Sequence, residues 1–129
     1  MTETGAVRGK PLAFLRVDAL VLLAAGIAGF FALDEPWWLL PLLLLAPDLF
    51  MVGYARSTKT GALLYNLAHS YALPAVVGAA GIATDSTVAQ AVALIWFAHI
   101  GMDRVLGFGL KYDTDFKDTH LGRIGGARP

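Results

Sequence analysis

The sequence predicts an all-α integral membrane protein, a four-helix bundle with up-down-up-down topology and both termini in the cytoplasm. Three observations predict this fold. Of the 129 residues, 57% are hydrophobic, and the mean hydropathy is +0.60. Four apolar stretches each reach the roughly 20 residues that an α-helix needs to cross a bilayer core. All ten Lys and Arg residues can be assigned to one side of that membrane, which is the positive-inside pattern.

The predicted spans leave three short connections of alternating charge. The connection Asp34-Glu35 is acidic, the connection 56–59 is basic, and the connection 84–86 has one acid and no base. The tail 111–129 is also basic in part, so we expect it in the cytoplasm beside the middle connection. The single domain, 1–129, is therefore expected to have spans at 12–33, 36–55, 61–83 and 87–110.

The composition also indicates where the protein is located and which partners it has. The N-terminus lacks a clear cleavage site after its long apolar run, so we interpret that run as a retained first helix. A multi-pass protein of the cell inner membrane, in contact with membrane lipid, is the simplest expectation. The net charge is zero, and we predict no nucleic acid partner. Without cysteine, the chain has neither disulfides nor thiolate metal ligands.

Small residues and prolines predict local features of the spans. Gly26 and Gly29 offer a small-residue surface for close helix packing in the first span. Pro47 and Pro74 lie inside the second and third spans, where each removes a backbone donor. We therefore expect a kink or opening near each proline, beside polar residues such as Ser70.

Four ionisable residues are predicted to lie at one depth in the cytoplasmic half of the bundle. They are Asp48, His69, His99 and Asp103. At about 1.5 Å per residue, each falls in the same slab when its helix is placed across the bilayer. His99 and Asp103 are also one helical turn apart, so they share a face. Ionisable groups within spans are rare and usually mark a function or a pairing.

Two histidines and two carboxylates from three helices could bind a divalent metal such as Zn, Fe or Mn. A bound metal could activate water, so the preferred hypothesis is a metal-dependent hydrolase of a lipid-soluble or interfacial substrate. Asp48, His69, His99 and Asp103 would be metal ligands or acid/base groups. The remaining candidates are Tyr65 and Asn66, which would orient them, and Arg104 and Lys111, which would hold an anionic headgroup.

Other interpretations stay open. The four residues could instead form a hydrogen-bonded polar core with no catalytic role. The chain could also be a non-enzymatic accessory or assembly subunit, or a permease for a small solute or ion. Because four helices are few for a solute pathway, a permease would favour a homo-oligomer. The sequence does not fix the substrate, the metal or the oligomeric state.

Two longer motifs carry a resemblance to a known family. They are Tyr65-Asn-Leu-Ala-His-Ser-Tyr-Ala-Leu-Pro74, and His99-Ile-Gly-Met-Asp-Arg-Val-Leu-Gly-Phe-Gly-Leu-Lys-Tyr112 with the later Thr119-His-Leu-Gly122. Over roughly residues 12–123 the chain resembles the domain-of-unknown-function 4260 family, small bacterial membrane proteins. The resemblance implies a four-helix integral membrane protein and implies no activity. It also implies that His120 folds back toward the inner mouth of the bundle, where it would join the substrate-binding residues.

Overall fold

The computed structural model describes residues 5–125 and is all-α apart from one short strand pair. Within these residues the chain forms five α-helices and one 3-10 helix, η1. The helices are α1 (Lys10–Ala32), α2 (Leu39–Leu44), η1 (Ala46–Ala55), α3 (Thr58–His69), α4 (Ala72–Ala83) and α5 (Thr87–Val105). The strands β1 (Asp118–Thr119) and β2 (Gly122–Arg123) pair antiparallel.

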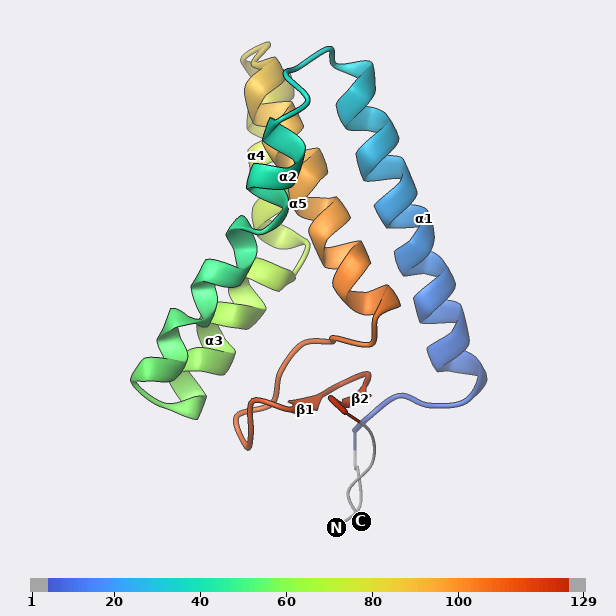
Figure 1. Ribbon diagram of the computed structural model, residues 1–129, viewed down its shortest axis with the longest axis vertical. Helices are drawn as coiled ribbons and strands as arrows, with labels where there is room; N and C mark the ends of the chain where they lie inside the picture. The colour runs from blue at the N-terminus through green and yellow to red at the C-terminus, as the bar shows by residue number, and fades with distance from the viewer. Residues whose placement is uncertain (1–4, 126–129) are drawn as a thin grey trace.

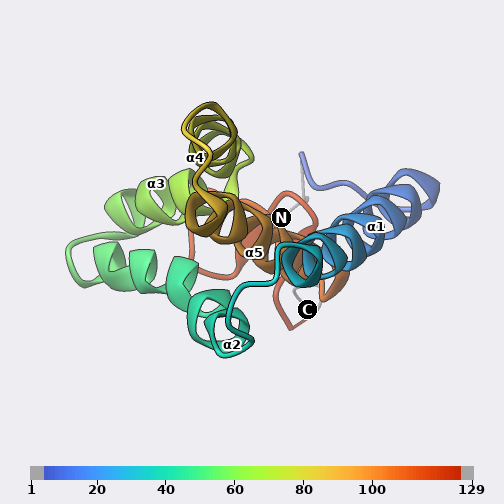
Figure 2. The same ribbon diagram turned by 90° about the horizontal axis from the view of Figure 1, so that it is seen from above.

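The helices form four successive segments that run in alternating directions (Figure 1). In that view α1 rises, α2 and η1 descend, α3 and α4 rise, and α5 descends. Helix α5 is central, because α1 and α4 both pack extensively against it and α2 also contacts it. Seen from above, η1 and α3 form a hairpin that leans away from the other helices (Figure 2). The two halves of the structure therefore differ, with a tight upper bundle and a splayed lower hairpin.

The second and third predicted spans are each broken near the proline where a kink or opening was predicted. The span 36–55 divides at Leu45 into α2 and η1, and the span 61–83 divides at Ser70 and Tyr71 into α3 and α4. Ser70 is extended, with φ −97° and ψ 163°. The prolines explain the position of these breaks, since Pro47 lies at the start of η1 and Pro74 in the first turn of α4, where a missing N–H is tolerated. The fourth span also ends earlier than predicted, at Val105 instead of 110.

Glycines allow the close packing of α1 on α5, as the small-residue pattern predicts. A Cβ on Gly26 would lie 2.7 Å from the carbonyl oxygen of Leu94, and a Cβ on Gly101 would lie 2.7 Å from that of Ala19. Both distances are too short for a carbon atom, so each helix presents bare backbone to the other. Small residues at such crossings are typical of helix pairs in membranes.

Large apolar side chains are exposed on every helix, while three ionisable side chains, His69, His99 and Asp103, are buried. The most exposed include Val21 at 63%, Leu49 at 74%, Val76 at 66% and Ile82 at 70%. Soluble monomers rarely expose contiguous apolar surface on this scale. By length and composition, α1 is the one described helix that could cross a membrane; α2 and η1 together give a shorter apolar helical stretch.

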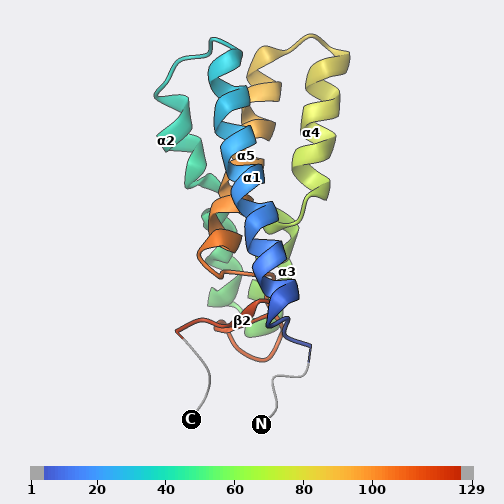
Figure 3. The same ribbon diagram turned by 90° about the vertical axis from the view of Figure 1, so that its right-hand side faces the viewer.

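The chain after α5 folds back beneath the bundle (Figure 3). Helix α5 ends in a Schellman motif, in which the N–H of Phe108 donates to Asp103 O and that of Gly107 to Arg104 O. Gly107 has φ +92°, a left-handed conformation that glycine adopts without strain. This turn directs residues 108–123, here called the tail cap, across the lower end of α3.

Candidate metal centre

The four residues grouped by depth in the sequence lie together in the structure. Asp48 comes from the first turn of η1, His69 is the last residue of α3, and His99 and Asp103 lie one turn apart on α5. One ligand atom from each of the four lies within 4.8 Å of the others. Three of the side chains are buried, and only Asp48, at 36%, is substantially exposed.

The histidines contact each other and both carboxylates. The Nε2 atoms of His69 and His99 are 3.0 Å apart. Asp48 Oδ1 lies 3.3 Å from His69 Nε2 and 3.2 Å from His99 Nε2. Asp103 Oδ2 lies 3.1 Å from His69 Nε2 and 3.3 Å from His99 Nε2. Four donor atoms therefore surround one small volume.

The hydrogen bond at Nδ1 of each imidazole fixes which ring nitrogen carries the proton. Nδ1 of His69 lies 2.8 Å from the carbonyl oxygen of Tyr65, and Nδ1 of His99 is hydrogen-bonded to that of Leu44. A carbonyl only accepts hydrogen bonds, so each Nδ1 must donate. In the neutral imidazole the proton is then on Nδ1, and Nε2 presents a lone pair to the centre. The same arrangement, with one imidazole nitrogen on a backbone carbonyl and the other on the metal, orients ligating histidines in known metal sites.

This tautomer makes the centre a cluster of acceptors. With neutral histidines, two imidazole lone pairs and two carboxylate oxygens face one another, with no proton between them. One added proton could join only one pair of these atoms. Two protonated imidazoles would point N–H groups at each other across the 3.0 Å that separates their Nε2 atoms. A divalent cation would satisfy all four atoms and balance both carboxylate charges.

The spacing of the donor atoms fits a tetrahedral ion. For metal–ligand bonds of about 2.0–2.1 Å, as zinc forms with histidine and carboxylate ligands, a regular tetrahedron has edges of roughly 3.3 Å. The five distances that involve a histidine nitrogen are 3.0–3.3 Å. The donor set and the geometry therefore suit Zn²⁺, and imidazole with carboxylate also suits Fe²⁺ or Mn²⁺.

The two helix breaks supply the backbone groups that support the centre. At the change from α2 to η1, Asp48 N bonds to Leu45 O and not to Leu44 O, which leaves the Leu44 carbonyl for His99. At the end of α3, Trp96 Nε1 donates to Ala68 O at 2.6 Å. The carbonyl end of a helix carries partial negative charge, so the end of α3 also favours a cation beside His69.

Tyr65 contacts two of the four residues. Its ring stacks on the His69 imidazole, with centroids 3.7 Å apart and 8° between the planes. Its hydroxyl donates to Asp103 Oδ2 at 3.3 Å. Tyr65 therefore contacts one imidazole and one carboxylate of the group.

Asn66 and Lys111 lie next to this group and do not join it. The Asn66 amide bonds to the backbone of Lys111, and the Lys111 ammonium donates to Phe116 O at 2.7 Å. The ammonium also lies 4.6 Å from the Tyr65 ring centroid, where a cation is attracted to the π face. Burial lowers the pKa of Lys111 to about 8. Lys111 is thus an internal contact of the tail cap.

Arg104 and His120 are also engaged within the fold. Arg104 donates to the Tyr71 hydroxyl at 2.7 Å and to His69 O at 3.3 Å. Nδ1 of His120 accepts from Leu110 N at 2.8 Å, so His120 pairs with the chain that follows α5. Burial, with the positive charge of Arg104, lowers the pKa of His120.

Sequence reasoning missed two supporting groups. The indole of Trp96 caps α3, although its position in an apolar run indicates only packing. The role of the Leu44 carbonyl cannot be predicted from the residue type. Only the nearby Pro47 indicated that backbone groups there would lack helical hydrogen bonds.

Comparison with known proteins gives a family without an assigned activity. The family described as Domain of unknown function (DUF4260) matches residues 12–124. Neither the curated proteins nor the solved structures contain a match to this chain. The matched segment includes the four clustered residues and the whole tail cap. By this match, the chain belongs to the DUF4260 family.

Proposed function

We propose that this protein is a membrane-embedded metalloprotein whose metal centre, formed by Asp48, His69, His99 and Asp103, binds one divalent transition metal, with Zn²⁺ preferred. The carrying observation is the convergence of two imidazole lone pairs and two carboxylate oxygens at 3.0–3.3 Å. Both Nδ1 atoms are committed to backbone carbonyls, so neutral histidines leave the centre without a positive charge. A divalent cation supplies that charge.

The distribution of apolar surface supports a location in the membrane. Every helix exposes large apolar side chains, while His69, His99 and Asp103 are buried. This is the arrangement expected when the surrounding solvent is lipid. With the charge pattern of the connections, it supports a multi-pass protein of the cell inner membrane with both termini in the cytoplasm.

Within that proposal, hydrolysis is the reaction that the centre supports best. A bound divalent metal activates water and polarises a carbonyl or phosphoryl oxygen. Asp48 is the most exposed of the four ligands, so substrate and water would reach the centre there. In a hydrolase, His69, His99 and Asp103 would hold the metal and leave one position open, as in catalytic zinc sites. The Asp48 carboxylate would then accept one proton as the water oxygen bonds to the carbonyl carbon of an ester, and that proton would pass to the departing alkoxide.

A second candidate is a cation permease, and the broken helices favour it. Transporters often place ion sites where spanning helices are interrupted, and here η1 and α3 both meet the centre at such breaks. An accessory subunit that carries a structural metal would use the same ligands. Permeation would require a water-accessible route from both faces, and activity as a homo-oligomer would fit the small number of helices.

Metal analysis of the purified protein tests the proposal. After purification in detergent and dialysis against trace zinc, we expect about one zinc per chain by elemental analysis. His99→Ala should lose most of that zinc while retaining helical circular dichroism and a monodisperse elution. His120→Ala is the matched control, because it removes the one histidine that lies outside the centre, and it should retain zinc. Wild-type protein without metal, or equal zinc in both variants, would refute the proposal.

A further inference from the structure

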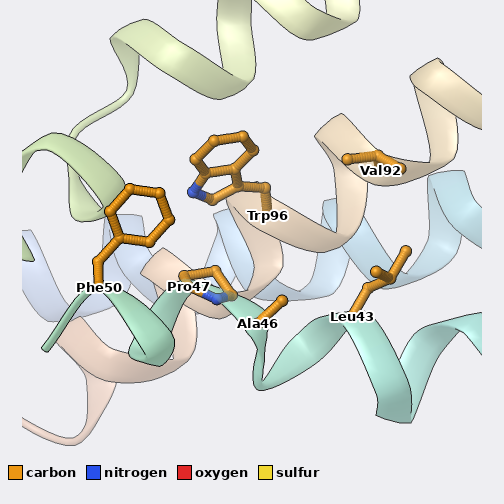
Figure 4. A pocket seen from close by; sticks show the side chains of 6 residues that line it. All are labelled: Leu43, Ala46, Pro47, Phe50, Val92 and Trp96. Carbon is orange, nitrogen blue, oxygen red and sulfur yellow. The ribbon is translucent and has the colours of Figure 1, made fainter. Parts of the chain in front are cut away.

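A small apolar cavity adjoins the metal centre. Its volume is about 150 Å³, and it lies between α5 and the broken α2–η1 segment. Figure 4 shows Trp96 and Val92 of α5 facing the residues of the broken segment. The cavity is lined by Leu43, Ala46, Pro47, Phe50, Val92 and Trp96.

The lining offers no free polar side-chain group. The only polar side-chain atom among these residues is the indole nitrogen of Trp96, which already donates to Ala68 O at 2.6 Å. A polar ligand would therefore lose its hydrogen bonds to water without replacement. A volume of about 150 Å³ is enough for an apolar group the size of benzene. The chemistry selects an apolar group of about six carbons.

The cavity and the metal centre are neighbours along η1 and along α5. Pro47 immediately precedes Asp48, and Trp96 lies one helical turn before His99 on α5. None of the four ligand residues lines the cavity itself. A molecule that used both places would therefore put its head at Asp48 and its apolar segment between Pro47 and Trp96.

The opposite approach to the centre is closed by the tail cap. Lys111, Thr119 and Leu121 of this segment are each at most 5% exposed. The Lys111 ammonium covers the face of Tyr65, whose hydroxyl binds the ligand Asp103. Among the ligands only Asp48 is substantially exposed, so a substrate must approach on its side, next to the apolar cavity.

We infer that the cavity is the chain-binding subsite of the metal centre. It takes an alkyl or acyl segment of about six carbons from an amphiphilic substrate, whose oxygen-bearing head lies at Asp48. This inference rests on the proposed metal function and narrows its substrate class to amphiphiles. Water-soluble polar substrates of the same head chemistry would bind more weakly, because they leave the cavity unfilled.

Alkyl hydroxamates of increasing length are suitable probes, because the hydroxamate head binds metal ions and the chain is the only variable. Zinc-loaded protein in detergent would be titrated with hydroxamates of two, four, six, eight and ten carbons. We expect affinity to rise about fourfold per methylene, the equivalent of about 0.8 kcal/mol, up to about six carbons. Beyond that length the chain leaves the cavity, and the affinity should stop rising.

Cavity-filling variants separate this subsite from partition into detergent. Val92→Phe and Ala46→Leu should abolish the increase with chain length while retaining zinc and the affinity for the two-carbon hydroxamate. Retained zinc shows that each variant is folded. Val88→Phe is the matched control, since Val88 lies one turn earlier on α5, is 54% exposed and does not line the cavity. It should behave as wild type.

The outcomes distinguish the two proposals. Zinc binding with hydroxamate affinities that do not depend on chain length would refute the subsite and leave the metal centre standing. The same chain-length dependence in the filled variants would refute it too. A protein without zinc would refute the metal function and the subsite with it. Replacing Trp37 and Trp38 by phenylalanine leaves Trp96 as the only tryptophan, so its fluorescence reports on the cavity. Quenching of that fluorescence by brominated phospholipid, with no effect of hydroxamates, would show that bilayer lipid occupies the cavity instead.

Discussion

The side chain of Asn66 pairs with the backbone of Lys111 through two hydrogen bonds. Nδ2 of Asn66 donates to Lys111 O at 2.8 Å, and Oδ1 accepts from Lys111 N at 2.7 Å. An amide thus takes the place of a neighbouring strand and joins the tail cap to α3. Because one group must donate and the other accept, no carboxylate can replace the amide at this position.

Asn66→Asp should therefore release the tail cap. The carboxylate would face the Lys111 carbonyl without a donor, and an unsatisfied buried group costs about 1–3 kcal/mol. We expect faster proteolytic cleavage within residues 111–123 and a lower thermal midpoint in detergent. Lys59→Ala, which removes an exposed side chain from the same helix, should change neither. Equal cleavage of the two variants would show that the pair does not hold the cap.

The metal-free centre should behave as a coupled network. In chelator-treated protein, His99→Ala would leave Asp103 buried with fewer partners, at a cost of about 1–3 kcal/mol. Adding Asp103→Leu should recover part of this loss, because the uncompensated charge is gone. Thermal denaturation of the single and double variants in detergent measures the coupling. Strictly additive losses would contradict a shared network.

The hairpin of η1 and α3 depends on Gly61. A Cβ there would lie 2.2 Å from the Tyr54 ring, so Gly61→Ala must displace the ring and should cost about 1–3 kcal/mol. Tyr54→Ala in the same chain should remove the clash and make the second change nearly neutral. Gly78→Ala is the control, since its Cβ would meet only the Ala93 Cβ, at 3.2 Å. Thermal midpoints in detergent should be measured for Gly61→Ala, for its combination with Tyr54→Ala, and for Gly78→Ala.

Membrane topology can be measured by labelling, because the chain has no cysteine. We expect a membrane-impermeant maleimide to label Asp85→Cys in intact cells. Lys59→Cys and Thr114→Cys should react only after the membrane is permeabilised, because the positive-inside rule places the basic connection and the tail in the cytoplasm. Labelling of Thr114→Cys in intact cells would reverse the orientation and move the metal centre to the outer half.

Docking of the tail cap should strengthen as the pH rises. The pKa of His120 is lowered from 6.5 in the docked state, so between that lowered value and 6.5 the undocked chain binds more protons, and docking gains stability with increasing pH. The pKa of Lys111, lowered from 10.5 to about 8, gives a second rise between pH 8 and 10.5. Hydrogen exchange of the cap amides, corrected for intrinsic rates, should show both steps. Lys111→Met should remove only the upper one, and protection that falls over pH 8–10.5 in wild type would contradict the assignment.

The sequence alone determined the helical class, the approximate limits of the segments and the residues of the candidate centre. Segment limits follow from local hydropathy, and polar residues within apolar runs are conspicuous because burying them is costly. Matching their depths along straight helices was sufficient to place Asp48, His69, His99 and Asp103 together. The membrane topology and the roles of these residues stay predictions.

The tertiary structure decided how those residues are held. The carbonyls of Leu44 and Ala68, at the breaks beside the prolines, take their partners from α5, which lies far away in the sequence. The Leu44 carbonyl became a support for His99 only because η1 shifts its own hydrogen bonds by one residue. The same holds for Asn66, whose partner Lys111 is reached only after α5 turns back at Gly107. Such pairings depend on orientation and close approach in three dimensions, whereas hydropathy and depth are set by the order of residues along the chain.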